Sequence, residues 1–270
     1  MLRGRLVLII SVLILCLVTG TYCSAEILSG EVRKQDIYDE TGIIIDNRTG
    51  MPISNATVSI PAEGINTTSD GSGRFSLKIP NKAPLILSVN ADGYKPFSAI
   101  IDRNDLRLLA QESMKILMEK LSANHLVIDI DLHHLGDNSY SRNSANARDF
   151  SASADSTSFI KEFYVDGAKL KGQALLRIGS IIGIDTIIAR NMRQSRVRGA
   201  ASTPVKVILN SRIIGEITFN GDNKTFRIPP GLLKPNRHNR LEILTGINLN
   251  SDIDDRDYDD IEFMNVILEL

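Results

Sequence analysis

The sequence predicts an all-β protein made of two β-sandwiches. Three observations support this. Short segments that alternate apolar and polar residues recur along the chain after Val18, and Gly, Asn, Asp and Pro separate them. Only Asp105–Glu112 is rich in helix formers and lacks this alternation, and it is expected to be a short helix or a crossover before the last strand of its series. The length of 270 residues allows two domains that each bury a core.

The first 25 residues are expected to be a secretory signal peptide. Arg3 and Arg5 precede an apolar run over Leu6–Val18, and a polar segment then ends in Cys23-Ser24-Ala25, after which we expect cleavage. The alternative is an uncleaved anchor, because the stretch from Leu6 to Ala25 is just long enough to span a bilayer. With cleavage, residues 26–36 are an N-terminal extension and no membrane span remains. We therefore expect a secreted, periplasmic or cell-surface protein.

The charge balance argues against a polyanionic partner. The chain has 31 Lys plus Arg against 32 Asp plus Glu, a formal net charge of −1. Nucleic-acid-binding domains usually carry a basic excess. No nucleic acid is expected as a partner.

The first series of strands follows from apolar alternation and turn signals. We expect strands at Gly42–Asp46, Ala56–Ile60, Gly73–Ile79, Leu85–Asn90 and Met114–Met118. Turn signals such as Asp70-Gly71 and Asp92-Gly93 stand between them. The first domain is placed at residues 37–120, before the segment Leu-Ser-Ala-Asn.

A second series begins near Asn124, and the second domain is placed at residues 124–270. His125–His133 alternates strictly, with Asp129, Asp131 and His133 on one face, and predicts one continuous strand. The polar stretch Gly136–Ser158 predicts a long loop. Further strands are expected at Phe159–Val165, Ala174–Ile178, Pro204–Leu209, Ile213–Phe219, Thr225–Ile228, Arg240–Thr245 and Ile261–Leu270.

The first domain resembles the carboxypeptidase regulatory-like family. The motifs that carry the resemblance are Gly42-Ile43-Ile44-Ile45-Asp46, the stretch Thr49–Ile60, the stretch Thr67–Leu77 with Asp70-Gly71, and Asp92-Gly93-Tyr94-Lys95-Pro96. The resemblance implies a seven-stranded Greek-key sandwich of the transthyretin-like type. It also implies an accessory module rather than a catalyst.

The second domain is similar to the jelly-roll, galactose-binding-like sandwiches found in extracellular proteins. The similarity lies in Val205–Asn210 with Ile214-Gly215, in Phe226–Pro229, in Asn239–Ile243 and in Asp257–Phe263. It implies a jelly-roll-like β-sandwich that binds a ligand without transforming it. Asn236-Arg237-His238 departs from the pattern, because a glycine turn is usual there.

Candidate binding residues gather at two places in the second domain. Sugar sites commonly combine an aromatic ring with side chains that bond hydroxyl groups. The candidates of this kind are Asp129, Asp131, His133, Asp137, Tyr140 and Tyr258. His134 has the parity of Leu132, so we expect a partly buried, hydrogen-bonded residue rather than a metal ligand or catalyst.

The second place is the acidic segment Asp252–Glu262, in which Asp255, Asp257, Asp259 and Asp260 are candidate metal ligands. If these acids converge with the Asp129 row at one edge, a structural calcium ion would suit them, since Ca²⁺ takes six to eight oxygen ligands. The alternative is a solvated acidic loop beside the last strand. No EF-hand spacing is present to favour the metal.

Taken together, the sequence predicts an exported, non-catalytic protein that binds a carbohydrate or another extracellular or envelope component through the jelly roll. One alternative is a structural or adhesive envelope protein without a small-molecule site. A second is a metal-assisted hydrolase that uses Asp129, Asp131 and His133. Sequons at Asn47, Asn55, Asn66 and Asn223 matter only in a host that glycosylates its secreted proteins. The oligomeric state stays open.

Overall fold

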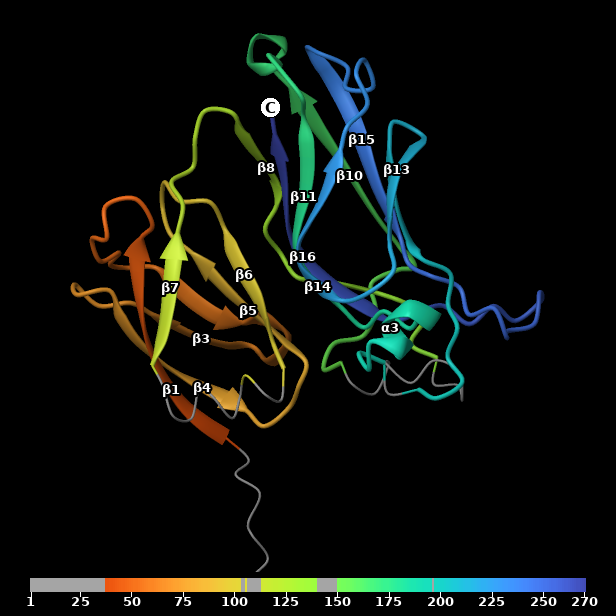
Figure 1. Cartoon of the computed structure of the whole chain (residues 1–270), viewed down its shortest axis with the longest axis horizontal. Helices are drawn as coiled ribbons and strands as arrows, with labels where there is room; N and C mark the ends of the chain where they lie inside the picture. Colours follow the sequence, from red (N-terminus) through yellow and green to blue (C-terminus); the bar gives the residue numbers. More distant parts are fainter. Residues whose placement is uncertain (1–36, 103–104, 106–112, 140–149, 196) are drawn as a thin grey trace, which may run out of the picture. The chain divides into compact units, whose positions relative to one another are not determined.

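Strands form most of the regular structure in the part of the chain that the computed structural model describes, namely residues 37–102, 105, 113–139, 150–195 and 197–270. The strands form two sandwiches, as the sequence predicts (Figure 1). Both lie within Asp36–Leu270, which is one compact unit. Within these ranges, no helix has the length and apolar character needed to cross a membrane.

The first sandwich contains seven of the described strands, in agreement with the predicted Greek-key type. They are β1 (Ile37–Asp46), β2 (Thr57–Ile60), β3 (Ile65–Thr68), β4 (Arg74–Pro80), β5 (Leu85–Asn90), β6 (Phe97–Ile101) and β7 (Met114–Met118). One sheet has the order β4-β1-β7 and the other β3-β2-β5-β6. β1 and β7 pair in parallel, whereas the other pairs are antiparallel.

Strand β4 shows how the sequence builds this sandwich. Phe75, Leu77 and Ile79 are buried in the core, while Ser76 and Lys78 between them are exposed. Such alternation is typical of a strand with one face on a core and the other in water. The apolar side chains of the two sheets therefore meet in one core.

Strands β3 and β6 were not predicted from the pattern. The sequence of β3, Ile-Asn-Thr-Thr, has one apolar residue, and β6 begins directly after Pro96. Their places depend on pairing with β2 and β5 rather than on their own alternation. The segment Asp105–Glu112, which is rich in helix-forming residues, lies outside the described residues apart from Asp105.

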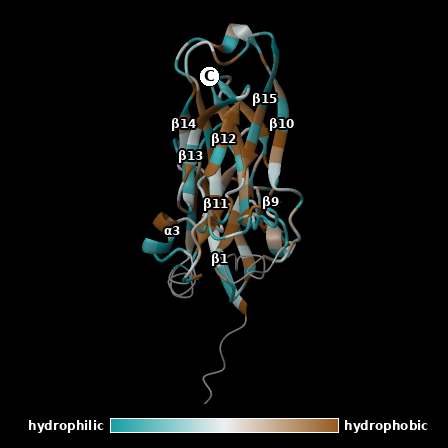
Figure 2. Ribbon diagram, turned by 90° about the vertical axis from the view of Figure 1, so that its right-hand side faces the viewer, coloured by the Kyte–Doolittle hydropathy of each residue, from teal (hydrophilic) through white to brown (hydrophobic). Residues whose placement is uncertain are grey.

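The second sandwich is formed by the remaining strands. These are β8 (His125–Asp129), β9 (His133–Leu135), β10 (Ser158–Val165), β11 (Leu175–Ile182), β12 (Val205–Leu209), β13 (Arg212–Ile217), β14 (Gly221–Arg227), β15 (Arg237–Leu244) and β16 (Ile261–Glu269). One sheet has the order β10-β15-β12-β13, and the other has the order β14-β11-β16-β8 with β9 also paired to β16. Figure 2 shows hydrophobic residues concentrated in these strands. The two sheets agree with the predicted jelly-roll-like sandwich.

The predicted strand His125–His133 is wrong in its length. β8 ends at Asp129, and the chain bends before β9 begins at His133. The cause is the Asp129 carboxylate, which accepts a hydrogen bond from the backbone N–H of Asp131 at 2.9 Å and so favours a turn. As a result, Ile130 is exposed while Asp129 is buried, the reverse of a continuous strand.

One helix was also missed. Helix α3 (Ile187–Asn191) begins after Thr186, whose Oγ1 accepts a hydrogen bond from Ala189 N at 3.1 Å. The predicted hairpin at Asn210-Ser211 is confirmed, since both residues have positive φ as a two-residue turn of type I′ requires.

The two sandwiches pack directly against each other within the compact unit. Ile86 of β5 contacts Ile182 of β11 and Met264 of β16 in a small apolar cluster. Beside it, Ser180 Oγ lies 2.9 Å from Ser98 Oγ and 2.6 Å from Asp222 Oδ1. The sheet containing β5 and β6 therefore covers the outer face of β11 and β16.

Candidate functional site

The predicted row of Asp129, Asp131 and His133 does not form an open binding face. Asp129 Oδ2 lies 2.7 Å from Lys161 Nζ, and its Oδ1 lies 3.1 Å from His133 Nε2. Burial opposes ionisation of Asp129, but hydrogen bonds from Lys161, the Asp131 backbone and His133 outweigh it and lower its pKa. His133 also packs on the ring of Phe159, with centroids 4.5 Å apart. These contacts hold the end of β8 in place.

The other predicted sugar contacts are partly brought together. Asp137 Oδ2 accepts a hydrogen bond from the backbone N–H of Tyr258 at 2.8 Å. Its Oδ1 accepts one from Ser139 N, also at 2.8 Å. Tyr140 lies outside the described residues. Asp137 is therefore a contact between two loops, in addition to any role toward a ligand.

The acidic segment is exposed over residues 252–256, which include Asp255, and its acids are buried from Asp257 onward. Asp259 and Asp260 have no exposed surface, and Asp257 is 9% exposed. The prediction of a solvated loop is therefore wrong for these three residues. The reason is that the acids accept hydrogen bonds from other segments, which burial then protects from water.

Each of these carboxylates contacts a different group. Asp257 Oδ2 accepts from Asn248 Nδ2 at 3.1 Å, and Asp259 Oδ2 accepts from Asp185 N at 2.9 Å. Asp260 Oδ1 lies 3.1 Å from His134 Nε2. Burial, and then repulsion by Asp185, raise the pKa of Asp259.

This arrangement does not fit the predicted calcium site. Ca²⁺ needs six to eight oxygens around one point. Across the described ranges, no three His, Cys, Asp or Glu side chains are grouped so that they could hold a metal ion. A mechanism that relies on a metal at these acids has no support in their geometry.

His134 is a buried, hydrogen-bonded residue, as expected from its parity. It is 3% exposed, and its Nδ1 lies 2.7 Å from the carbonyl oxygen of Ala152. With Asp260 at its other nitrogen, both ring nitrogens face acceptors. Burial opposes protonation of the ring, but the bonds to Asp260 and Ala152 outweigh it and raise the pKa of His134.

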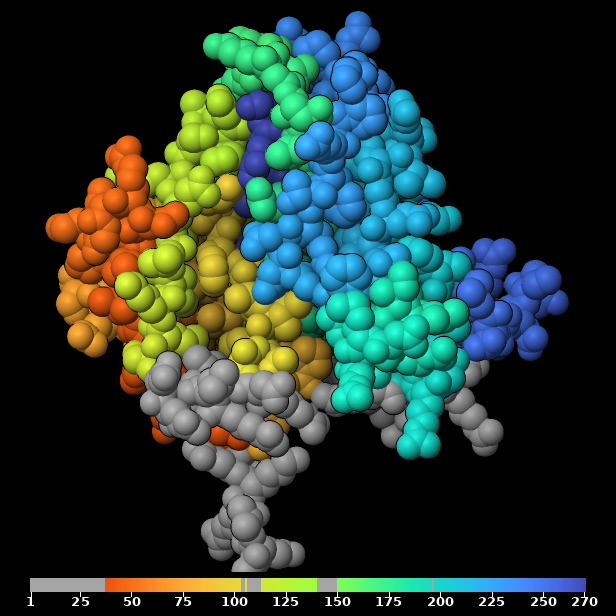
Figure 3. Space-filling view, in the orientation of Figure 1, coloured from red at the N-terminus to blue at the C-terminus, as the bar shows by residue number. Residues whose placement is uncertain are grey.

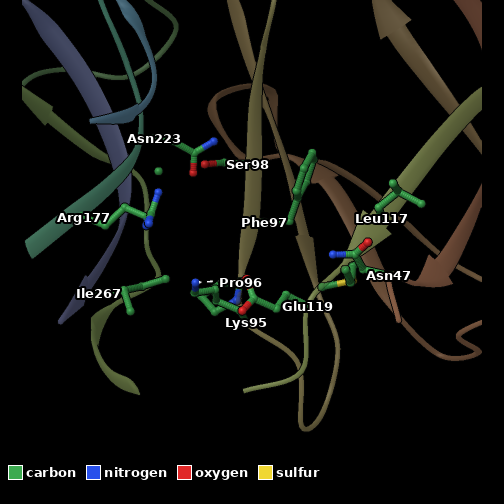
Figure 4. Close-up of a pocket in the computed structure, with 12 residues that line it drawn as sticks. Asn47, Lys95, Pro96, Phe97, Ser98, Leu117, Glu119, Arg177, Asn223 and Ile267 are labelled. Carbon is green, nitrogen blue, oxygen red and sulfur yellow. Dashed lines mark hydrogen bonds and ion pairs between the residues drawn. The ribbon is translucent and has the colours of Figure 1, made fainter. Parts of the chain in front are cut away.

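A pocket with open hydrogen-bonding groups lies where the two sandwiches meet, and we call it the junction pocket. It has a volume of about 330 Å³. Its walls include Asn47, Lys95, Phe97, Ser98, Glu119, Arg177, Gly179 and Asn223. Figure 3 shows the surface hollowed where the segments of the two sandwiches meet. In Figure 4, Arg177 and Asn223 stand on one side, opposite Asn47 and Leu117 on the other.

Ion pairs fix the base of the junction pocket. Lys95 Nζ lies 3.2 Å from Glu119 Oε2 and 3.0 Å from Glu269 Oε1. Arg177 Nε lies 3.0 Å from the same Glu269 oxygen. Burial opposes ionisation of Glu269, but hydrogen bonds from Arg177 and Lys95 outweigh it and lower its pKa. Glu269 thus stays ionised and holds both cations, while the guanidinium keeps further N–H groups for other acceptors.

Close backbone approach gives the pocket its back wall. A Cβ on Gly179 would meet Ser98 Oγ at 2.5 Å and Asn265 Cβ at 2.7 Å, so only glycine fits between β6 and β16. Asp222 Oδ1 also accepts from Ile100 N at 3.1 Å. Burial raises the pKa of Asp222. The pocket walls are therefore tied together by contacts from both sandwiches.

The junction pocket was not predicted from the sequence. Lys95 stood out only within the motif Asp92–Pro96, on the strength of a family resemblance. Arg177, Asn223 and Glu269 lie on three different strands, and nothing in their spacing brings them together. A signal was present in β16, where consecutive apolar residues over Val266–Leu268 point to both faces, as is typical of a strand covered on both sides.

The fold and site define a protein of two β-sandwiches with a small-molecule-sized pocket where the sandwiches meet. Residues 40–122, which hold most of the first sandwich, match the family model of the CarboxypepD_reg-like domain. No sequence among the curated proteins matches the chain.

Several solved structures match at low similarity. They include a β-D-glucuronidase from Dictyoglomus thermophilum (9% identity, TM-score 0.27, 54% of this chain and 29% of that one), a proposed carbohydrate-binding protein from Bacteroides uniformis (10%, 0.23, 86% and 98%) and a proposed membrane-associated protein of unknown function from Bacteroides fragilis (11%, 0.23, 86% and 97%). The chain thus spans under a third of the length of the glucuronidase. With TM-scores below 0.5, these similarities do not establish a shared fold.

Proposed function

We propose that this chain is an exported, non-catalytic protein that binds a short glycan in the junction pocket. The observation that carries the proposal is that one aromatic ring and three polar groups line the same pocket. These are the Phe97 ring, the Arg177 guanidinium and the amides of Asn47 and Asn223. A sugar ring has apolar C–H faces and hydroxyl groups that both donate and accept hydrogen bonds. An aromatic ring with amide and guanidinium groups complements both features.

The size of the pocket agrees with such a ligand. A volume of about 330 Å³ lies at the lower end of the range of roughly 300–1,000 Å³ found for small-molecule sites. This favours a ligand of mono- or disaccharide size, or the end of a longer glycan. Export is inferred from the signal-like first 25 residues.

The absence of an arranged acid and base in the pocket supports binding without hydrolysis. Glu119 is directed to Lys95, and Glu269, whose pKa is lowered, is held by Lys95 and Arg177. A glycosidase needs one carboxyl group that stays protonated to act as general acid. The family of the first sandwich is likewise regulatory rather than catalytic. The hydrolase alternative built on Asp129, Asp131 and His133 gains no support, because Lys161 and His133 already bind the Asp129 carboxylate.

The test is a calorimetric titration with neutral mono- and disaccharides, preceded by a glycan array. Asn47→Ala and Arg177→Lys should each weaken binding, by ~10- to 100-fold where a hydrogen bond to a charged group is lost. Arg212→Lys, at the exposed first residue of β13, is the matched control and should bind normally. If no glycan binds, or if the pocket variants bind as well as the parent, the proposal is wrong and the structural envelope alternative gains.

A further inference from the structure

A second and larger hollow lies on the other side of the segment that carries Lys95, and we call it the β8-side hollow. It has a volume of about 720 Å³. The loop 52–57, the turn 90–96 and the end of β8 form its walls. Of the residues that line it, Pro96 alone also lines the junction pocket. In the sheet β14-β11-β16-β8, the junction pocket takes residues of β14, β11 and β16, whereas this hollow takes Val127 of the edge strand β8.

The lining of the β8-side hollow has the chemistry of a neutral, hydroxyl-rich ligand. Its polar side chains are hydroxyls, carboxamides and one carboxylate, supplied by Ser54, Asn55, Thr57, Asn90 and Asp92. Neither Lys nor Arg is present among the lining residues. The apolar part of the wall includes Val127 and Ile130, and Ile130 is 42% exposed although it is a large aliphatic residue. Amides and hydroxyls both donate and accept, as sugar hydroxyls do.

An aromatic ring is held rigidly in this wall. Tyr94 Oη donates a hydrogen bond to Asp46 Oδ2 at 3.0 Å. Asp46 Oδ1 also accepts from the backbone N–H groups of Arg48 at 2.9 Å and Thr49 at 2.8 Å. The backbone bond from Thr49 contributes most to lowering the pKa of Asp46 to about 2, so the acceptor remains ionised. The tyrosine hydroxyl is therefore engaged, and its ring is fixed before any ligand arrives, which lowers the ordering cost of binding.

The turn that presents the polar groups is fixed as well. Gly93 has φ +77°, a conformation that other residues rarely adopt, and nothing lies within 4 Å of the place of its missing Cβ. Its carbonyl oxygen accepts from Leu121 N at 2.9 Å, and Lys95 N donates to Glu119 O at 2.8 Å. Asp92 and Tyr94 therefore flank a glycine whose positive φ the turn requires.

We infer that the β8-side hollow is a second saccharide-binding site, specific for uncharged glycans and separate from the junction pocket. Asp92 and the absence of a lining cation disfavour uronic acids and other anions. The hollow has more than twice the volume of the junction pocket, so it takes the longer stretch of glycan. Two neighbouring sites allow a single chain to hold two glycan segments, which raises the effective affinity for a polymer.

The experiment follows backbone amide signals by NMR while neutral hexasaccharides of glucose, xylose and mannose are added one at a time. Gly93 and Tyr94 report on the β8-side hollow, and Ser98 and Gly179 report on the junction pocket. The protein is produced in a host that adds no N-linked glycans, because Asn55 lies in this hollow and Asn47 and Asn223 lie in the other. A glucuronic acid oligomer serves as the charged comparison.

At least one hexasaccharide should shift the Gly93 and Tyr94 signals. Asn90→Ala and Asp92→Ala should each weaken that response ~10-fold, as expected for one lost hydrogen bond to the ligand, and leave the junction signals unchanged. Asn66→Ala, an exposed asparagine of β3 outside both cavities, is the matched control.

Four results decide the matter. Shifts confined to Ser98 and Gly179 overturn the second site and leave the proposed function standing. Shifts confined to Gly93 and Tyr94 support the second site and overturn the proposed function. Equal affinity for the glucuronic acid oligomer overturns the specificity for uncharged glycans. No shift with any of the neutral sugars overturns both proposals.

Discussion

Strands β4 and β16 differ in a way that locates the junction. Along β4, buried and exposed residues alternate from Arg74 to Ile79, because its outer face meets water. Along β16, every residue from Ile261 to Leu268 is buried, because the second core covers one face and the first sandwich and adjoining loops cover the other. The number of covered faces, rather than hydrophobicity alone, therefore decides which substitutions a strand tolerates.

The largest expected effect contrasts the outer faces of the two strands. Met264→Ala on β16 removes a side chain packed against Ile86 and Ile182, and should lower the free energy of unfolding by about 2–5 kcal/mol. Lys78→Ala on the outer face of β4 should change it by no more than about 0.5 kcal/mol. Urea unfolding measures both. Equal, small effects would mean that the outer face of β16 is not packed.

The second prediction concerns pH and the carboxyl group of Glu262 on β16. Burial raises the pKa of Glu262 to about 7 from the usual 4.5. An acid whose pKa is raised by folding favours the native state below pH ~4.5, and this contribution is lost as the pH rises through about 7. Glu262→Gln should therefore become more stable relative to the parent between pH 5 and 8, by about 3 kcal/mol in all.

Thermal or urea unfolding across this pH range gives the measurement. Glu216→Gln on β13, where the carboxylate is exposed, supplies the control and should leave the pH profile of stability unchanged. A parallel profile for the Glu262→Gln variant and the parent would contradict the prediction.

A smaller effect on stability is expected from replacing glycines, which also differ in whether another segment packs closely against them. Gly179→Ala places a Cβ 2.5 Å from Ser98 Oγ, and the adjustment should cost about 1–3 kcal/mol. Gly71→Ala places it where nothing lies within 4 Å, so stability should hardly change. The difference in urea midpoint between the two variants checks the close approach. Equal midpoints would show that the junction can open without cost.

The smallest effect is expected from calcium. Asp257, Asp259 and Asp260 bind separate protein groups, so the native state offers no common site for the ion. Ca²⁺ and EDTA should leave the melting temperature unchanged, because only a ligand that binds the native state raises it. A rise with Ca²⁺ that Asp257→Asn abolishes would restore the metal site predicted from the sequence.

The fold was largely predictable because alternation and turn residues act locally. Phe75 and Leu77 identify the face of β4, and Asn210-Ser211 identifies a hairpin, without knowledge of any partner. The break after Asp129 was missed, because alternation does not show that the Asp129 carboxylate accepts from the backbone N–H of Asp131 while Lys161, on a distant strand, holds that carboxylate. Local pattern predicts strands, whereas side-chain partners decide where they stop.

The sites were less predictable for the same reason. Asp259 and Asp260 have the composition of a surface loop, and only the positions of Asp185 and His134 explain their burial. Lys95, Arg177 and Glu269 meet because three distant segments converge. Part of the β8-side hollow was visible in the sequence as the motif Asp92–Pro96, which contains Gly93 and Tyr94. We had interpreted this motif only as a feature of the fold, because it carries the family resemblance.

The position of β16 between β11 and β8 also affects how the chain reaches its native state. Both neighbours lie far upstream in the sequence, so their pairing with β16 closes long loops and is expected to be slow. Until β16 docks, the apolar surface of β11 stays exposed together with the matching face of β5 and β6. The stage before docking is therefore when the chain is most prone to aggregation, and the arrival of one strand ends that risk for both sandwiches.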